Sequence, residues 1–365
     1  MSFKELPIFV LESAAHSGID WTHSLLDSHS QILIMPAFSF YRTIYEIEIR
    51  NSIDLKRKNN DEISEIFSDL FLNDKIYQVK RRKFIYNEEE KKIFKESFCK
   101  YLKNNNDNFY KKIFFGLHYA FCALYKKDIS KLKCIVIHEH VTWHYKKYDL
   151  FSNVKHILVF RNPKAAIAGS IYKLRQLNKM GKINAFQFDH MILDMLCTFE
   201  IYKSNNKKFL KLQNEEMHEN FKYQLMRLCH WLNIEFEETL LSQTFLGKEW
   251  KGESVYLAWD EVKEKPSEEY YLEKNVEKRW RNVLSQKDIL LIESIFYDYM
   301  KVFGYKFDNK MNFFKRVKGY YYYLTLYLKQ DKYAYSKSLI YLRNIIRKIS
   351  ILIFTYRVAN FFKFK

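Results

Sequence analysis

Glycine, proline and paired cysteines are scarce in this chain. Its 365 residues include only 8 Gly and 4 Pro, which argues against long irregular loops and predicts a high helical content. The five cysteines are odd in number, widely spaced and form no CxxC pair. We therefore expect neither a disulfide framework nor a cysteine-based zinc site, and a reducing cytoplasmic setting fits this usage.

Long apolar runs are also missing. No run approaches the roughly 20 residues that a membrane-spanning helix needs, and the first residues lack the basic and apolar regions of a secretory signal. We therefore expect a cytoplasmic protein. The length, with 48% hydrophobic and 28% charged residues, suits one large α/β domain with an appendage.

Acidic residues are rare near the end of the chain. The net charge is +18, and residues 311–365 hold 12 Lys and Arg but one acidic residue, Asp331. Basic and aromatic residues at helical spacing are typical of helices on anionic lipid. We thus expect a helical arm over 309–365 that associates with the inner face of the membrane. Packing on the domain, homodimerisation and nucleic-acid binding are the alternatives, but no nucleic-acid motif is present, so no nucleic-acid partner is expected.

Strand and helix patterns alternate along the rest of the chain. Apolar runs predict strands at 7–11, 133–137, 156–160 and 209–212, and helices at 19–28, 165–177 and 221–232. Such alternation indicates βαβ units and a mostly parallel sheet. Residues 46–128 are polar with helical apolar spacing and predict a helical insert. The fold class is therefore a three-layer α/β domain over residues 1–308.

The first chemical motif follows the first predicted strand. In SAAHSGIDW (13–21), small residues let the backbone approach an anion, and the helix start supplies N–H groups and a favourable dipole. His16 would add partial positive charge. The alternative is structural: Ser17 and Asp20 form a capping box that satisfies the first N–H groups itself, and Asp20 would repel an anion.

Two further strand ends carry polar side chains. Arg161-Asn162-Pro163-Lys164 follows one strand, and Arg161 can grip a phosphate bidentately; an ordinary turn with a surface arginine is the alternative. His138, Glu139 and His140 follow another strand, at the sheet edge where α/β proteins bind ligands. An imidazole there can accept a proton from a hydroxyl, or the group is an incidental solvated loop. His138 and His140 share a strand face, but no third ligand is apparent, so no metal is expected.

These segments, in this order, resemble the PAPS-dependent sulfotransferase family, PAPS being 3′-phosphoadenosine-5′-phosphosulfate. Ser17, Gly18 and Trp21 match its phosphosulfate loop, and RNPK (161–164) matches its 3′-phosphate segment. LGKEWKGES (246–254) and EKRWR (277–281) are similar to its later segments, so the resemblance covers roughly 5–307. His16, Ile19 and Asp20 depart from the basic residue and two threonines of the family. Gly169 stands where the family has serine, and Ser170 follows it.

The resemblance implies a P-loop-type fold and transfer of a sulfuryl group from PAPS to a hydroxyl or amine, without a metal. It implies that the loop, with Ser17, Gly18, Ile19, Asp20 and Trp21, holds the phosphosulfate and adenine, and that Arg161, Ser170 and Arg279 hold the 3′-phosphate. His16 would hold the transferring group. The base would be His138, which stands 23 residues before Arg161 as in cytosolic members, or Glu139 together with His144 as in bacterial members.

The acceptor is suggested only by the arm, which would suit a carbohydrate or glycolipid substrate. Two alternatives remain open at this point. One is a sulfotransferase-fold protein without PAPS chemistry that serves in binding or assembly, which Ile19 and Asp20 favour. The other is a transferase that uses a different nucleotide-linked donor.

Overall fold

A computed structural model describes most of the chain. The described residues are 3–14, 16–35, 39–72, 86–140, 148, 150–177, 185–204, 208–245, 247–250, 273–325, 346, 348–351 and 353. These ranges contain a central sheet and the helices that surround it.

The centre of the structure is a five-stranded sheet in which all strands run parallel, in the order β2-β3-β1-β4-β5. A short antiparallel pair, β6-β7, lies apart from it. The strands are β1 (Ile8–Ser13), β2 (Ile32–Ile34), β3 (Cys134–Glu139), β4 (Val154–Phe160), β5 (Phe209–Gln213), β6 (Thr244–Phe245) and β7 (Lys248–Glu249). The central strand β1 is buried along its whole length, as expected for a sheet that helices cover on both faces.

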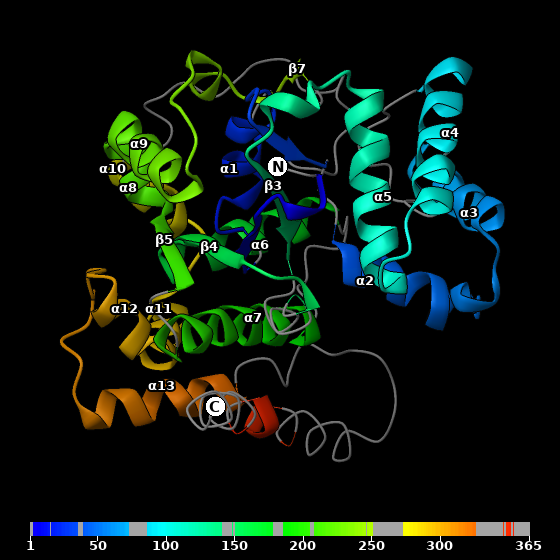
Figure 1. Cartoon of the computed structure of the whole chain (residues 1–365). Coiled ribbons are helices and arrows are strands. Elements are labelled where there is room, and N and C mark those ends of the chain that lie inside the picture. Colours follow the sequence, from blue (N-terminus) through cyan, green and yellow to red (C-terminus); the bar gives the residue numbers. More distant parts are fainter. Residues whose placement is uncertain are drawn as a thin grey trace.

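Helices surround this sheet (Figure 1). They are α1 (Ile19–Leu26), α2 (Phe40–Tyr45), α3 (Asn60–Leu72), α4 (Glu88–Asn104), α5 (Phe109–Leu124), α6 (Pro163–Leu177), α7 (Ala185–Ser204), α8 (Asn214–Glu219), α9 (Phe221–Leu232), α10 (Glu273–Arg281), α11 (Gln286–Ile295), α12 (Tyr297–Val302) and α13 (Phe313–Thr325). A π-helical turn, η2 (Glu46–Arg50), continues α2.

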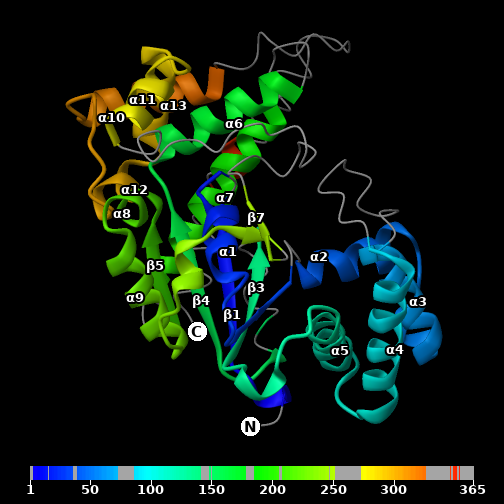
Figure 2. The ribbon, with the colours of Figure 1, turned by 90° about the horizontal axis from the view of Figure 1, so that it is seen from above.

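Alternate side chains of β1 enter different apolar clusters, because successive residues of a strand point to opposite faces. Ile8 and Val10 pack with the helices of the insert, α3 to α5, whereas Phe9 and Leu11 pack with α1 and α9. The β4 end joins a third cluster with α6, α7, α11 and α12. Figure 2 shows β5, β4, β1 and β3 side by side, with α3 to α5 set to one side. The sheet is thus the middle of three layers.

The predicted α/β class with a parallel sheet and a helical insert is confirmed. The predicted helix 221–232 has the same bounds as α9, and the four predicted strands are present with ends that differ by one or two residues. Several elements escaped prediction, among them β2 and α7. β2 has only three residues, and α7 is apolar around much of its surface, so neither shows a clear period.

The described part of the arm packs on the domain. α13 lies beside α11 in Figures 1 and 2, and a Cβ added to Gly319 would lie 1.9 Å from Ser294 Oγ. Tyr323 is fully buried in the cluster of α11 and α12, and Lys348 Nζ donates a hydrogen bond to its carbonyl at 2.6 Å. Among the described helices, none is long and apolar enough to cross a membrane.

Candidate functional site

The loop between β1 and α1 lies at the carboxyl edge of the sheet. His16 and Gly18 adopt left-handed backbone conformations, with φ of 63° and 98°. Gly18 is the N-cap of α1, and no side chain caps the helix. The capping box of Ser17 and Asp20, which was the structural alternative for this segment, is therefore not formed. The φ of 98° disfavours any residue other than glycine at position 18, and an added Cβ would lie 2.2 Å from Asn214 Oδ1, so Asn214 would also have to move.

Asp20 instead lies beside the histidines that end β3. Its Oδ1 is 3.8 Å from His138 Nε2, and His138 Nε2 is 2.9 Å from His140 Nε2. On the other side of the His138 ring, Nδ1 is 3.0 Å from Nδ1 of His23, which belongs to α1. Three imidazoles and one carboxylate thus form a continuous cluster, which we call the His–Asp cluster (Asp20, His23, His138 and His140).

The cluster runs from the core to the surface. His23 and His138 have no exposed surface, while His140 is half-buried and 27% of the Asp20 side chain is exposed. His23 stacks on Phe245 with ring centroids 4.5 Å apart, which fixes its orientation. The Asp20 and His140 end therefore lies nearest the surface, although Asp20 Oδ1 itself is buried, while the His23 end is held in place.

Glu139 lies on the opposite face of the sheet from its neighbour His138. Its carboxylate accepts hydrogen bonds from Ser39 Oγ at 2.8 and 2.6 Å and from Tyr148 Oη at 2.9 Å, and it has no exposed surface. Burial, reinforced by this carboxylate, holds the pKa of Tyr148 well above its ordinary value. The structure therefore does not bring both predicted bases to one site.

Arg161 reaches the loop after β1. Its Nη1 donates a hydrogen bond to the His16 carbonyl at 3.0 Å, and Tyr299 Oη bonds to both the N–H and the carbonyl of Arg161. The guanidinium Nε is buried and has no hydrogen-bond partner among the described residues. The loop after β1 and the RNPK segment thus meet, through residues that are 145 positions apart in the sequence. The Nε–H of Arg161 remains available as a hydrogen-bond donor.

Glu215 and His218 lie close enough to Arg161 for its charge to affect their pKa values. Burial raises the pKa of Glu215, although the Arg161 charge opposes this shift; Glu215 accepts hydrogen bonds from the Asn162 amide and from Tyr305. Burial and the Arg161 charge lower the pKa of His218 to about 4. His218 is therefore neutral at physiological pH, and it stacks on Trp21 with ring centroids 4.0 Å apart.

Lys164 is occupied by structural contacts, although it belongs to the same RNPK segment. Its Nζ bonds to Glu293 at 3.0 Å and to Asp308 at 2.6 Å, and the side chain is 3% exposed. It also lies over the Trp280 ring. Lys164 therefore joins α6 to α11 rather than serving a ligand.

The other predicted donor-binding residues lie on nearby elements. Ser170 in α6 is 1% exposed, and its Oγ has no partner among the described residues, whereas a Cβ at Gly169 would meet open space. Ile19 is buried at the start of α1, and Arg279 is half-buried in α10, which packs on α6. Their roles stay predictions. His144 and much of 246–254 lie outside the described residues.

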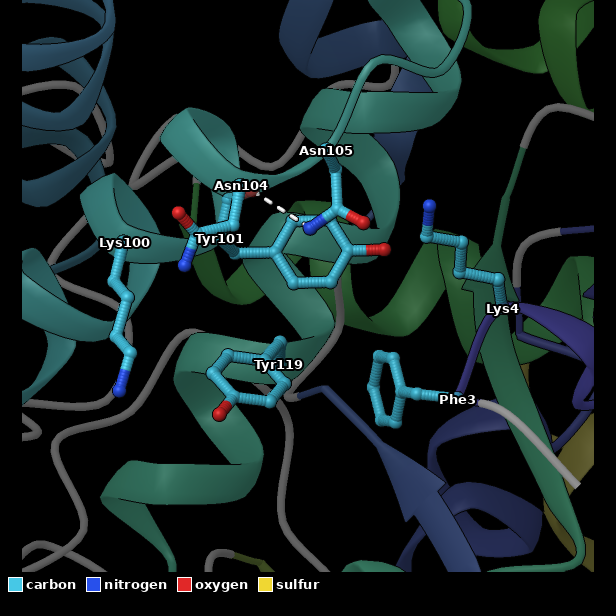
Figure 3. Close-up of a pocket in the computed structure, with 7 residues that line it drawn as sticks. All are labelled: Phe3, Lys4, Lys100, Tyr101, Asn104, Asn105 and Tyr119. Atoms are coloured by element: carbon cyan, nitrogen blue, oxygen red, sulfur yellow. Dashed lines mark hydrogen bonds between the residues drawn. The ribbon is translucent and has the colours of Figure 1, made fainter.

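A separate pocket lies between the N-terminal segment and helices α4 and α5 (Figure 3). Phe3, Tyr101 and Tyr119 supply its aromatic walls, and Asn105 donates a hydrogen bond to the Tyr101 carbonyl at 2.8 Å. None of its lining residues belongs to the His–Asp cluster or to the Arg161 region, so this pocket is distinct from the candidate site.

His23, Asn214 and Glu215 are site residues that the sequence analysis missed. One signal could have found His23: it follows Asp20 by three residues, and residues so spaced share a helix face. Asn214 and Glu215 follow β5, and the order of strands in the sheet brings Asn214 to Gly18 and Glu215 to the Asn162 backbone N–H. The sequence pattern does not show this order.

No family model matches the chain, and no curated protein matches it in sequence. The chain is similar to solved structures of sulfotransferase domains. They include those of the Synechococcus PCC 7002 olefin synthase (14% identity, 82% of this chain and 95% of that chain, TM-score 0.48) and of the curacin biosynthetic pathway (15%, 83% and 99%, 0.48). Sulfotransferase STF9 from Mycobacterium avium is a third (12%, 84% and 79%, 0.39). Identities and TM-scores this low do not establish the family of the chain.

Proposed function

We propose that this protein is a sulfotransferase that takes PAPS as donor and a hydroxyl or amine as acceptor. The observation that carries the proposal is the contact between Arg161 and the loop after β1. It places a guanidinium, a left-handed glycine turn and the start of α1 at one sheet edge, and each of these favours an anion. The motifs that resemble the sulfotransferase family, in their order along the chain, favour PAPS as this anion.

The residues present fit a donor with two phosphate-bearing ends. The buried Nε of Arg161 and the Oγ of Ser170 lack partners among the described residues, and a phosphate would supply acceptors. The backbone at His16 to Gly18 suits the phosphosulfate. Asp20, which would otherwise repel it, faces His138 instead.

We place the base in the His–Asp cluster rather than at Glu139. His140 is partly accessible and is hydrogen-bonded to His138, so a proton taken from an acceptor can pass inward along the imidazoles. The Glu139 carboxylate is enclosed by Ser39 and Tyr148. Loop amides and His16 would stabilise charge on the transferring group through positioning, as in phosphoryl transfer.

We further propose a carbohydrate or glycolipid acceptor and contact with an anionic membrane surface through α13. One side of α13 packs on α11, while Phe313, Phe314, Val317 and Tyr321 are 51–80% exposed on its other side. Lys315 and Lys318 lie on the same helix. An apolar face with basic neighbours is the composition that lipid interfaces attract.

Calorimetry with nucleotides tests the donor assignment. We expect 3′,5′-adenosine bisphosphate to bind more tightly than 5′-AMP, because only the former offers a 3′-phosphate to Arg161. Arg161→Ala should remove most of this preference, about 10- to 100-fold, since a charge-assisted bidentate contact is worth about 1.5–3 kcal/mol. Arg227→Ala, which removes an arginine of α9, is the matched control and should retain the preference. Equal affinity of the unaltered protein for both nucleotides would contradict the proposal.

A further inference from the structure

The His–Asp cluster has the composition of a metal site as well as that of a proton relay. Asp20, His138 and His140 each direct one ligand atom to a common region, and these three atoms all lie within 4.8 Å of one another. Two imidazoles and one carboxylate form a ligand set that binds divalent transition metals, zinc and iron in particular.

We propose that Asp20, His138 and His140 bind one divalent transition-metal ion, with Zn²⁺ as the best match. Two ligands of a tetrahedral zinc ion, each about 2.0–2.1 Å from the metal, lie about 3.4 Å apart. The separations from His138 Nε2 are 2.9 Å to His140 Nε2 and 3.8 Å to Asp20 Oδ1. These distances lie on either side of the zinc value, so small rotations of half-buried side chains complete the geometry.

His23 acts as the positioning residue for this site. Metal-binding histidines almost always engage their second ring nitrogen in a hydrogen bond, which fixes the tautomer and the ring orientation. His138 Nδ1 has such a bond, at 3.0 Å to His23 Nδ1, and this leaves Nε2 directed at His140 and Asp20. Stacking on Phe245 holds His23 itself.

The site is accessible and offers an open position. His138 is buried, but His140 is half-buried and Asp20 is partly exposed, so an ion enters from the Asp20 side once the carboxylate, whose Oδ1 is buried, rotates. Three ligands from the described part of the chain leave one tetrahedral position for a further ligand, water or substrate.

This inference goes beyond the proposed sulfotransfer and does not depend on it. A bound ion occupies the lone pairs of His138 and His140, so these nitrogens do not serve as bases in the loaded protein. Metal binding is therefore measured without nucleotide, and nucleotide binding is measured on protein treated with chelator. Each proposal can then fail by itself.

The test is a Zn²⁺ titration of the full-length protein against a chromophoric chelator. We expect one site per chain, with affinity lowered at least 10-fold by Asp20→Asn and by His140→Ala, which alter accessible side chains and should leave the fold intact. His230→Ala, on the exposed side of α9, should bind zinc as the unaltered protein does. Affinity should fall as the pH is lowered, because protons compete with the metal for the imidazole nitrogens.

A second pair of variants tests the positioning role. His23→Leu removes the partner of His138 and should weaken zinc binding about 10- to 100-fold. His23→Asn, whose side-chain amide can reach the place of Nδ1, should retain most of the affinity. Binding of no zinc by the unaltered protein, or equal binding by the Asp20→Asn and His140→Ala variants, would overturn the proposal and leave a hydrogen-bonded imidazole chain.

Discussion

His138 and Glu139 are consecutive in β3, are equally buried and both carry ionisable side chains, yet they meet two different environments. On the insert face, Glu139 is closed in by hydroxyl donors within an aromatic cluster. On the α1 face, His138 continues through His140 and Asp20 to the surface. Burial of an ionisable group therefore does not by itself mark a functional site; a path from that group to solvent is needed as well.

The same contrast separates Arg161 from Lys164. Lys164 is saturated by Glu293 and Asp308, whereas Arg161 bonds to the loop and keeps a buried Nε without a described partner. Two basic residues of one short segment thus divide into a structural and a ligand-directed residue.

The largest effect should come from comparing variants of His138 and Glu139, the two neighbouring residues of β3. In the chelator-treated protein, we expect His138→Ala to lower turnover by about 10²–10⁴-fold, because it removes the centre of the proton path. Glu139→Gln should change turnover by no more than a few-fold but lower the free energy of unfolding by about 1–3 kcal/mol, because an amide N–H then faces the Ser39 and Tyr148 donors. Formation of 3′,5′-adenosine bisphosphate from PAPS measures turnover, and urea denaturation measures the free energy of unfolding. The opposite pattern would place the base on the insert face.

A smaller effect, on the pH dependence of stability, should come from Asp194 in α7. Glu139 accepts hydrogen bonds from Ser39 and Tyr148, and the Asp194 carboxyl group lacks such donors among the described residues. Its Oδ1 is buried and lacks a hydrogen-bond partner among the described residues, and burial raises its pKa to about 7. The folded protein then holds a proton that the unfolded chain releases near the ordinary aspartate pKa of 3.8. Stability should accordingly fall as pH rises from about 4 to 7.

Asp194→Asn should remove this dependence. We expect the variant to be more stable than the unaltered protein by about 1–2 kcal/mol at pH 8, a value reduced for the partial exposure of the residue, and equally stable at pH 4. Thermal unfolding across this range provides the comparison. A gain in stability of equal size at both pH values would show that the carboxyl charge is not the cause.

The smallest effect should appear at α13, where an inner and an outer face can again be compared. Replacing Phe313 and Phe314 together by Asp should weaken binding to vesicles containing phosphatidylserine by about 10-fold, since two exposed rings lose their contact with lipid. Tyr223→Asp, at an exposed aromatic on α9, is the control. Unchanged vesicle binding in the double variant would remove α13 as the membrane contact.

Local patterns sufficed to predict four of the five strands of the parallel sheet, three of its flanking helices, the helical insert and the sheet edge that carries the candidate site. The two motifs at 13–21 and 161–164 do meet, as their positions after parallel strands predict. The capping box failed because Gly18, held against Asn214, begins the helix and leaves Asp20 to turn toward His138. The sequence analysis also missed Asp20 as a third ligand beside His138 and His140. Asp20 lies in α1, and only the packing of the folded chain brings this helix near the end of β3.

The central claim is that Arg161 and the loop after β1 together hold a nucleotide with a 3′-phosphate. A crystal structure of the chelator-treated protein with 3′,5′-adenosine bisphosphate tests it most directly. The account predicts the 3′-phosphate within hydrogen-bond distance of the Arg161 guanidinium and the 5′-phosphate against the backbone of residues 16–18. A nucleotide bound elsewhere, or bound with Arg161 touching no phosphate, would contradict it.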